Sequence, residues 1–129
     1  MKRRLALWVP VALWAGLLFF LSSRSDLGPA GRIPDWLTHG TAYLLFAVLM
    51  ARAAAGGLGR PLAATTALLV VLAVTLYGLS DEWHQSFVPG RDSSAGDVAK
   101  DAGGACLGVL LFRRLRPLSD LGDGPRTAA

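Results

Sequence analysis

Four apolar segments dominate this chain, and they set what it can fold into. Each approaches the roughly 20 residues that a helix needs to cross a bilayer, and the last segment is the shortest and least apolar. Strands are excluded, because the segments lack alternation and lipid offers no partner to open backbone groups. The sequence therefore predicts an all-α, four-helix transmembrane bundle, with helices over about residues 5–21, 36–55, 62–87 and 95–115.

Composition supports a single membrane domain. Hydrophobic residues make up 53% of the chain and charged residues only 17%, which is too apolar for an ordinary small soluble domain. We expect one transmembrane domain over residues 1–116, with the first helix retained rather than cleaved as a secretory signal. Residues 117–129 have little to bury and are predicted to form a disordered cytoplasmic tail.

Basic residues are distributed unevenly over the predicted loops. An excess of basic residues on one side of the membrane explains the basic character of the chain, so no nucleic-acid partner is expected. The positive-inside rule puts both termini in the cytoplasm and predicts a multi-pass protein of the cell membrane. One side would hold Lys2, Arg3, Arg4, Arg52, Arg60, Arg113, Arg114, Arg116 and Arg126, and the other only Arg24, Arg32, Arg91 and Lys100.

A dense polar stretch, DEWHQSFVPGR, follows the third apolar segment. Polar groups beside a membrane span are costly unless they are paired or functional, so this stretch is a candidate site on the outer side. If the helix continues through it, Asp81, His84 and Gln85 share a face, and Glu82 points elsewhere. The planar guanidinium of Arg91 suits a carboxylate or a phosphate.

Two other helices carry polar residues at helical spacing. Asp35, His39 and Tyr43 follow one another at intervals of four residues and fall on one face of the second helix. On the last helix, Asp97 and Asp101 share a face with two glycines of the segment GACLG. That small-xxx-small pattern predicts close helix packing, which would draw the two aspartates toward the other helices.

Three chemistries are compatible with such a cluster, and a fourth interpretation is purely structural. Proton transfer would use His39 and His84 as acid and base. A divalent metal would bind both histidines and one or two aspartates, although the spacing matches no metal motif, so the metal stays unknown. Anion capture would rely on Arg91. The structural alternative is a salt-bridge network that only locks the bundle.

The roles expected of individual residues follow from these chemistries. The acid/base histidines would be oriented by carboxylates that also serve as metal ligands, and a second group would bind the ligand. The catalytic candidates are His39, His84, Asp35, Asp81 and Asp97, and the binding candidates are Arg91, Gln85, Tyr43, Glu82 and Asp101.

The same residues resemble the VanZ-like family of small membrane proteins. The resemblance rests on the Asp35, His39 and Tyr43 spacing, on DEWHQSFVPGR and on Asp97 with the glycine-rich helix after it. Trp36 stands where the family often has Lys, and Asp101 where Asn is common.

What the resemblance implies is an envelope role with lowered susceptibility to glycopeptides such as teicoplanin. We expect a protein that modifies or shields a lipid-linked or cell-wall component, with membrane lipid and that precursor as partners and a homo-oligomer left open. A non-enzymatic binding or scaffold protein is the alternative. A proton-coupled transporter is disfavoured, because the acids gather near one surface and offer no deep relay.

Overall fold

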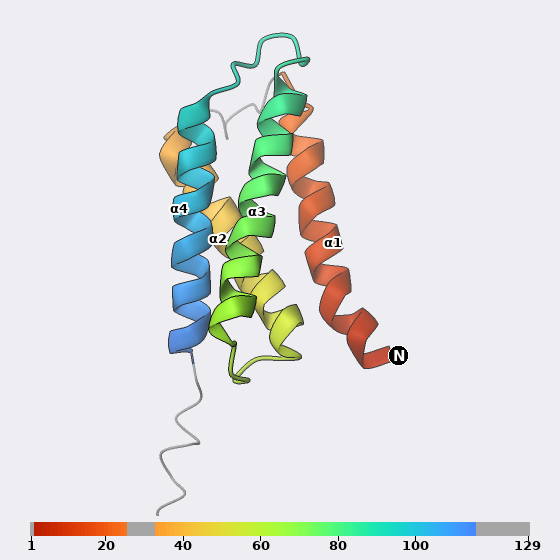
Figure 1. The fold of residues 1–129 in the computed structure, drawn as a ribbon. Coiled ribbons are helices and arrows are strands. Elements are labelled where there is room, and N and C mark those ends of the chain that lie inside the picture. Colours follow the sequence, from red (N-terminus) through yellow and green to blue (C-terminus); the bar gives the residue numbers. More distant parts are fainter. Residues whose placement is uncertain (1, 26–32, 116–129) are drawn as a thin grey trace, which may run out of the picture.

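The computed structural model describes residues 2–25 and 33–115. These residues form four helices and no strand: α1 (Lys2–Ser22), α2 (Asp35–Ala55), α3 (Ala64–Gln85) and α4 (Ala95–Arg114). The helices run alternately up and down, so the start of α1 and the end of α4 lie at the same end of the bundle (Figure 1). The all-α, four-helix prediction is confirmed. The tail predicted over residues 117–129 lies outside the described residues.

Glycines on α4 bring this helix against the backbone of α2. A Cβ on Gly104 would lie 2.5 Å from the carbonyl oxygen of Gly40, and one on Gly108 would overlap the carbonyl oxygen of Leu44. Side chains cannot occupy such positions, so only glycine permits this approach. Gly104 and Gly108 are buried on the same face of α4 as Asp97 and Asp101. The close contact therefore carries both aspartates into the bundle, as the small-xxx-small pattern predicted.

Helix α1 packs along α2 and α3 with most of its apolar side chains exposed, among them Leu5, Leu13 and Phe20. Two hydrogen bonds hold it in place: the indole N–H of Trp14 donates to the Ala42 carbonyl at 3.0 Å, and the Tyr77 hydroxyl donates to the Ala15 carbonyl at 2.6 Å. Leucine and phenylalanine side chains that are exposed along one helix are typical of contact with lipid.

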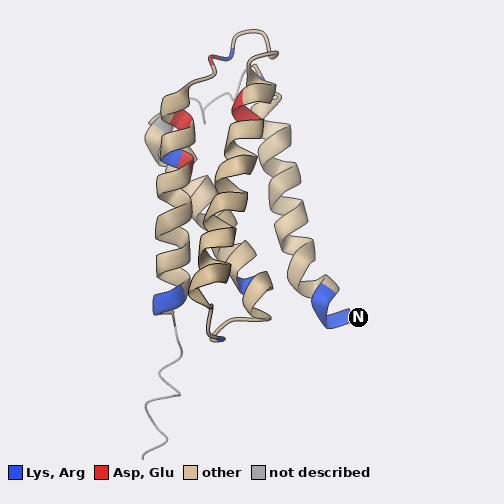
Figure 2. Ribbon diagram, viewed as in Figure 1, with Lys and Arg blue, Asp and Glu red and all other residues tan. Residues whose placement is uncertain are grey.

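Three of the described helices are long and apolar enough to cross a membrane: α1, α2 from Trp36 onward, and α3. Helix α4 is not among them, because it carries Asp97, Lys100 and Asp101 within its first two turns. Acidic residues gather at one end of the helices, while the start of α1 and the end of α4 are basic (Figure 2).

The described connections follow local sequence signals. Helix α2 ends at Gly56, whose φ of 80° is the left-handed conformation that glycine adopts readily. Between α3 and α4, Gly90 takes a φ of 79° in the turn after Pro89. The side chain of Ser94 then caps α4 by accepting a hydrogen bond from the Gly96 N–H at 3.0 Å. This turn returns the chain so that the first residues of α4 face the last residues of α3.

Candidate functional site

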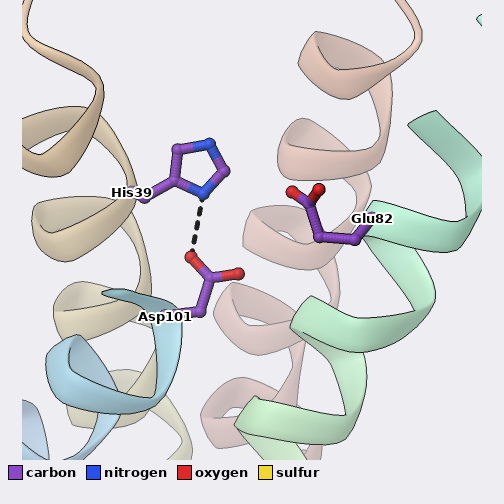
Figure 3. Close-up of side chains that lie close together, drawn as sticks. All are labelled: His39, Glu82 and Asp101. Carbon is purple, nitrogen blue, oxygen red and sulfur yellow. Dashed lines mark hydrogen bonds and ion pairs between the residues drawn. The ribbon is translucent and has the colours of Figure 1, made fainter. Parts of the chain in front are cut away.

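A buried histidine–carboxylate pair lies between α2 and α4. Nδ1 of His39 and Oδ1 of Asp101 are 2.9 Å apart, which is hydrogen-bonding distance, and Asp101 is fully buried at 0% exposure. Asp101 reaches this position because Gly104, one turn further along α4, lets the two helices touch. The imidazole of His39 points from α2 toward the Asp101 carboxylate (Figure 3).

Glu82 completes a three-helix cluster with this pair. It lies on α3 and is only 4% exposed. One ligand atom from each of His39, Glu82 and Asp101 can be chosen so that all three lie within 4.8 Å of one another. We call these three residues the buried triad. Glu82 faces the start of α4, where it accepts the Ser94 N–H, whereas Asp81 and Gln85 bond to each other.

Buried carboxylate oxygens in this region lack partners. Within the described residues, Oε1 of Glu82, Oδ2 of Asp101 and Oδ1 of Asp81 are buried and accept no hydrogen bond. The other oxygen of Glu82, Oε2, accepts the Ser94 N–H at 2.8 Å. Unpartnered buried carboxylate oxygens are costly in free energy, and their presence in a native protein calls for a proton, a water or a cation.

Space for the Asp101 carboxylate comes from Gly78 on α3. A Cβ at Gly78 would lie 2.6 Å from Oδ2 of Asp101 and 3.2 Å from Cε1 of Tyr43. No alanine fits there without moving the carboxylate. Gly78 is therefore a positioning residue for the triad.

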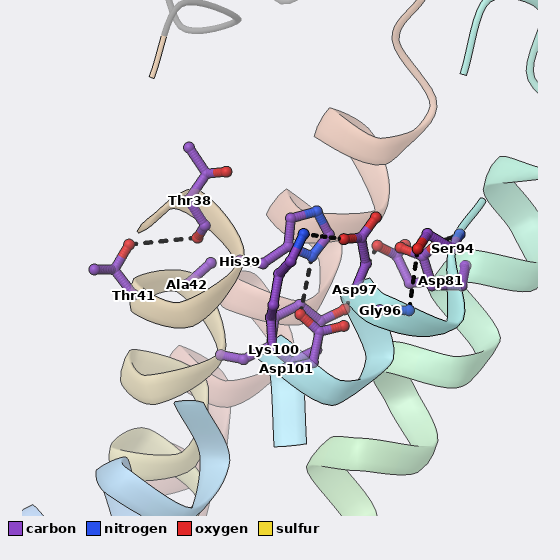
Figure 4. Close-up of polar contacts among 12 residues, drawn as sticks. Thr38, His39, Thr41, Ala42, Asp81, Ser94, Gly96, Asp97, Lys100 and Asp101 are labelled. Carbon is purple, nitrogen blue, oxygen red and sulfur yellow. Dashed lines mark hydrogen bonds and ion pairs between the residues drawn. The ribbon is translucent and has the colours of Figure 1, made fainter. Parts of the chain in front are cut away.

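A second carboxylate of α4 forms an ion pair on its own helix. Nζ of Lys100 lies 2.5 Å from Oδ1 of Asp97, one helical turn away. Asp97 is largely buried, whereas the Lys100 side chain keeps 35% of its surface. Figure 4 shows both residues beside His39 and Asp101 at the start of α4. The charge of Asp97 is thus balanced within α4.

A chain of hydrogen bonds links α2 to the loop after α3. Asp81 Oδ2 lies 3.5 Å from the Tyr43 hydroxyl and accepts from Nε2 of Gln85 at 3.2 Å. The amide oxygen of Gln85 in turn accepts from the Arg91 guanidinium at 3.2 Å. Tyr43, Asp81 and Gln85 are all buried, and Arg91 is half-buried. The structure thus brings together four of the predicted site residues.

His84 lies apart from these contacts. Its Nε2 is 3.0 Å from the Ser23 hydroxyl, and its ring stacks on Phe19 with the centroids 4.6 Å apart. Phe19 lies in the last turn of α1 and Ser23 directly follows this helix, so His84 faces α1 and not the triad. The prediction that His84 shares a face with Asp81 and Gln85 is therefore wrong. A metal site with both histidines, one of the alternatives drawn from the sequence, is not what the described residues form. Asp35 begins α2, and its side chain lies outside the described part of the structure.

A groove of about 420 Å³ lies beside the triad, bounded by α1, α2, α3 and the loop after α3. Its α1 wall is mainly apolar and includes Trp14, Leu17 and Leu21. The opposite side carries the polar groups His39, Tyr43, Asp81, Gln85 and Arg91. The groove therefore offers a polar end near the loop and an apolar wall along α1, which is the arrangement that an amphiphile requires.

Sequence reasoning did not predict the roles of three residues at this site: Trp14, which lines the groove; Gly78, which leaves space for Asp101; and Ser94, whose backbone N–H binds Glu82. Of these three residues, only Gly78 could have been identified from the sequence, because an isolated glycine inside a helical pattern often marks close packing against a neighbouring element. The roles of Trp14 and Ser94 depend on which helices are neighbours.

The fold and the site define a small helical membrane protein with carboxylates, a histidine and an amphiphilic groove gathered at one end of its bundle. The chain belongs to the VanZ/LLP1 family, whose model matches residues 5–116. No curated protein and no solved structure matched the chain in the corresponding comparisons. The resemblance drawn from the sequence is thus confirmed at the level of the family.

Proposed function

We propose that the protein binds an anionic, lipid-linked component of the cell envelope in the groove between α1, α2 and α3. The observation that carries this proposal is the groove itself, which joins the guanidinium of Arg91 to an apolar wall that includes Trp14 and Leu17. A phosphate or diphosphate head would contact Arg91, because a planar guanidinium donates two parallel hydrogen bonds to such groups. The lipid chain would lie along α1 and leave the groove toward the bilayer.

The proposal also includes the location of the protein in the membrane and its orientation. We place it as a multi-pass protein of the cell membrane, with both termini in the cytoplasm and the groove on the outer side. The separation of acidic and basic ends supports this orientation, since basic ends of helical bundles face the cytoplasm. By modifying or shielding a lipid-linked or cell-wall component on that side, the protein would lower susceptibility to glycopeptides such as teicoplanin.

Lipid binding can be measured on the purified full chain in detergent. Farnesyl diphosphate and farnesol share one apolar chain, so native mass spectrometry of both separates the head group from the tail. We expect the diphosphate to bind about ten- to a hundredfold more tightly, because hydrogen bonds to charged groups are each worth about 1.5–3 kcal/mol. Arg91→Ala should remove that preference. Equal binding of both compounds to the wild type would refute the proposal.

Arg24 offers a matched control for Arg91. It lies at the same end of the bundle, but its guanidinium stacks over the Phe20 ring at 4.5 Å and does not line the groove. In a glycopeptide-sensitive host, expression of the wild type and of Arg24→Ala should raise the inhibitory concentration of teicoplanin, and Arg91→Ala should not. Resistance that survives Arg91→Ala at equal membrane levels would contradict the proposed role.

A non-enzymatic scaffold is the second candidate, and the hydrogen bonds across the helices favour it. The bond between His39 and Asp101 ties α2 to α4, and the chain through Asp81 ties α2 to α3. If these bonds serve only to lock the bundle, His39→Gln should preserve function, because an amide also forms hydrogen bonds. If His39 transfers a proton, the same variant should be inactive although it folds.

A further inference from the structure

We propose that the buried triad of His39, Glu82 and Asp101 binds one divalent metal ion, and that it binds Zn²⁺ more tightly than Mn²⁺, Mg²⁺ or Ca²⁺. The inference goes beyond the proposed lipid binding and does not rest on it. The three residues come from α2, α3 and α4, so a bound ion would join three helices of the bundle. His39 also lines the groove, which would put the ion at its polar end.

Distances within the triad approach those of a coordination sphere. Two adjacent ligands of an ion with bonds of about 2.0–2.1 Å are about 2.9–3.4 Å apart. Nδ1 of His39 and Oδ1 of Asp101 are already 2.9 Å apart. All three ligand atoms lie within 4.8 Å of one another, so the glutamate must approach by about 1 Å at most to reach a shared ion. A rotamer adjustment of Glu82 covers such a shift.

Unpartnered oxygens give the independent evidence for a ligand. Oε1 of Glu82 and Oδ2 of Asp101 are buried without a hydrogen bond in the described part of the chain. Both side chains are more than nine-tenths buried, so water does not solvate them freely. The ion pair of Asp101 with His39 leaves these two oxygens without a partner. The carboxyl groups of Glu82 and Asp101 lie near one another in Figure 3, where a cation would contact both.

Charge balance points to a divalent ion. Two carboxylates and a neutral imidazole carry two negative charges, which a divalent cation offsets. Lys100 pairs with Asp97, so at least part of its charge is taken up by that carboxylate. An isolated buried carboxylate is otherwise neutralised by protonation, so the alternative to metal binding is a triad that holds one or two protons.

The donor set selects among metal ions. One nitrogen and two carboxylate oxygens suit Zn²⁺ and Mn²⁺, and the Irving–Williams order puts Zn²⁺ ahead of Mn²⁺. Ca²⁺ takes six to eight oxygen ligands and is excluded by a nitrogen-containing set of three. Mg²⁺ keeps most of its waters and prefers oxygen.

The test uses the purified full chain without a histidine tag, stripped with EDTA, dialysed and loaded with Zn²⁺. Cys106 is exposed and would bind zinc through its thiolate, so every variant carries Cys106→Ser. After desalting, metal analysis should give about one zinc per chain, and thermal unfolding should shift upward with Zn²⁺, less with Mn²⁺ and not with Ca²⁺. A shift with Ca²⁺ equal to that with Zn²⁺ would overturn the proposed donor set.

Isosteric variants identify the ligands. His39→Gln, Glu82→Gln and Asp101→Asn should each lose the zinc and the thermal shift, while Glu82→Gln keeps an oxygen for the Ser94 N–H. His84→Gln is the matched control, because His84 contacts α1 and lies outside the triad. It should retain about one zinc per chain.

The parent chain, changed only by Cys106→Ser, already decides the matter if a triad variant fails to fold. No zinc and no thermal shift in this parent chain would mean that the triad holds protons, and the metal proposal would be wrong. Zinc lost equally in His84→Gln and His39→Gln would also overturn it. Neither result bears on farnesyl diphosphate binding, so this proposal and the lipid proposal fail independently.

Discussion

Gly104 contacts α2, so substituting it tests how much helix packing, as distinct from helix propensity, contributes to the free energy of unfolding. A Cβ there would lie 2.5 Å from the Gly40 carbonyl oxygen, whereas ordinary contacts begin at 3.4 Å. In Gly104→Ala the two helices must therefore separate by about 1 Å, and overpacking of this kind costs about 1–3 kcal/mol. Separation would also lengthen the bond between His39 and Asp101.

Gly103, the preceding residue, provides the matched control. A Cβ on Gly103 meets nothing within 4 Å, so Gly103→Ala should be neutral or stabilise the helix by about 0.5–1 kcal/mol. The two variants change the composition identically, and the difference of about 1–3 kcal/mol between them isolates the packing. It can be measured by reversible unfolding in mixed micelles, followed by circular dichroism. Equal unfolding free energies for both variants would show that α4 does not touch α2 at Gly104.

Three further predictions concern single contacts. Gly78→Ala should weaken zinc binding without altering a ligand, because the new methyl group would lie 2.6 Å from Oδ2 of Asp101. A Cβ on Gly16 meets nothing within 4 Å, so the control Gly16→Ala should leave the zinc content unchanged. Ser94→Ala should lower the unfolding free energy by about 0.5–2 kcal/mol through loss of the α4 cap, while Ser93→Ala has no such effect, and equal losses would argue against the cap. Trp14→Phe should cost about 0.5–1.5 kcal/mol by removing the hydrogen bond to the Ala42 carbonyl, which chemical denaturation in micelles would measure, and an unchanged stability would mean that α1 does not lie as described.

The residues that share one face of a helix could be predicted from the sequence. Asp97, Asp101, Gly104 and Gly108 share a face because of their spacing alone, and the structure buries all four against the bundle. The same holds for the first three apolar segments, whose length and composition predict helices that can cross a membrane.

The neighbouring helix that each of these side chains faces could not be predicted from the sequence. Asp81, Glu82 and His84 are almost consecutive, and their spacing does not tell which neighbour each one faces. Helix α4 packs on the side of Glu82, and α1 packs beside His84, so the glutamate joins the triad and the histidine does not. The metal ligands expected from the residue types were therefore partly different from those that the fold brings together.

Side chains from α2, α3 and α4 meet in one buried triad, and histidine NMR tests this arrangement most directly. The chain has only two histidines, so their imidazole ¹⁵N resonances can be assigned by substituting each in turn. In micelles, Asp101→Asn and Glu82→Gln should each shift the resonances of His39 and leave those of His84 unchanged. Unchanged His39 resonances in both variants, or equal shifts of the two histidines, would contradict the account.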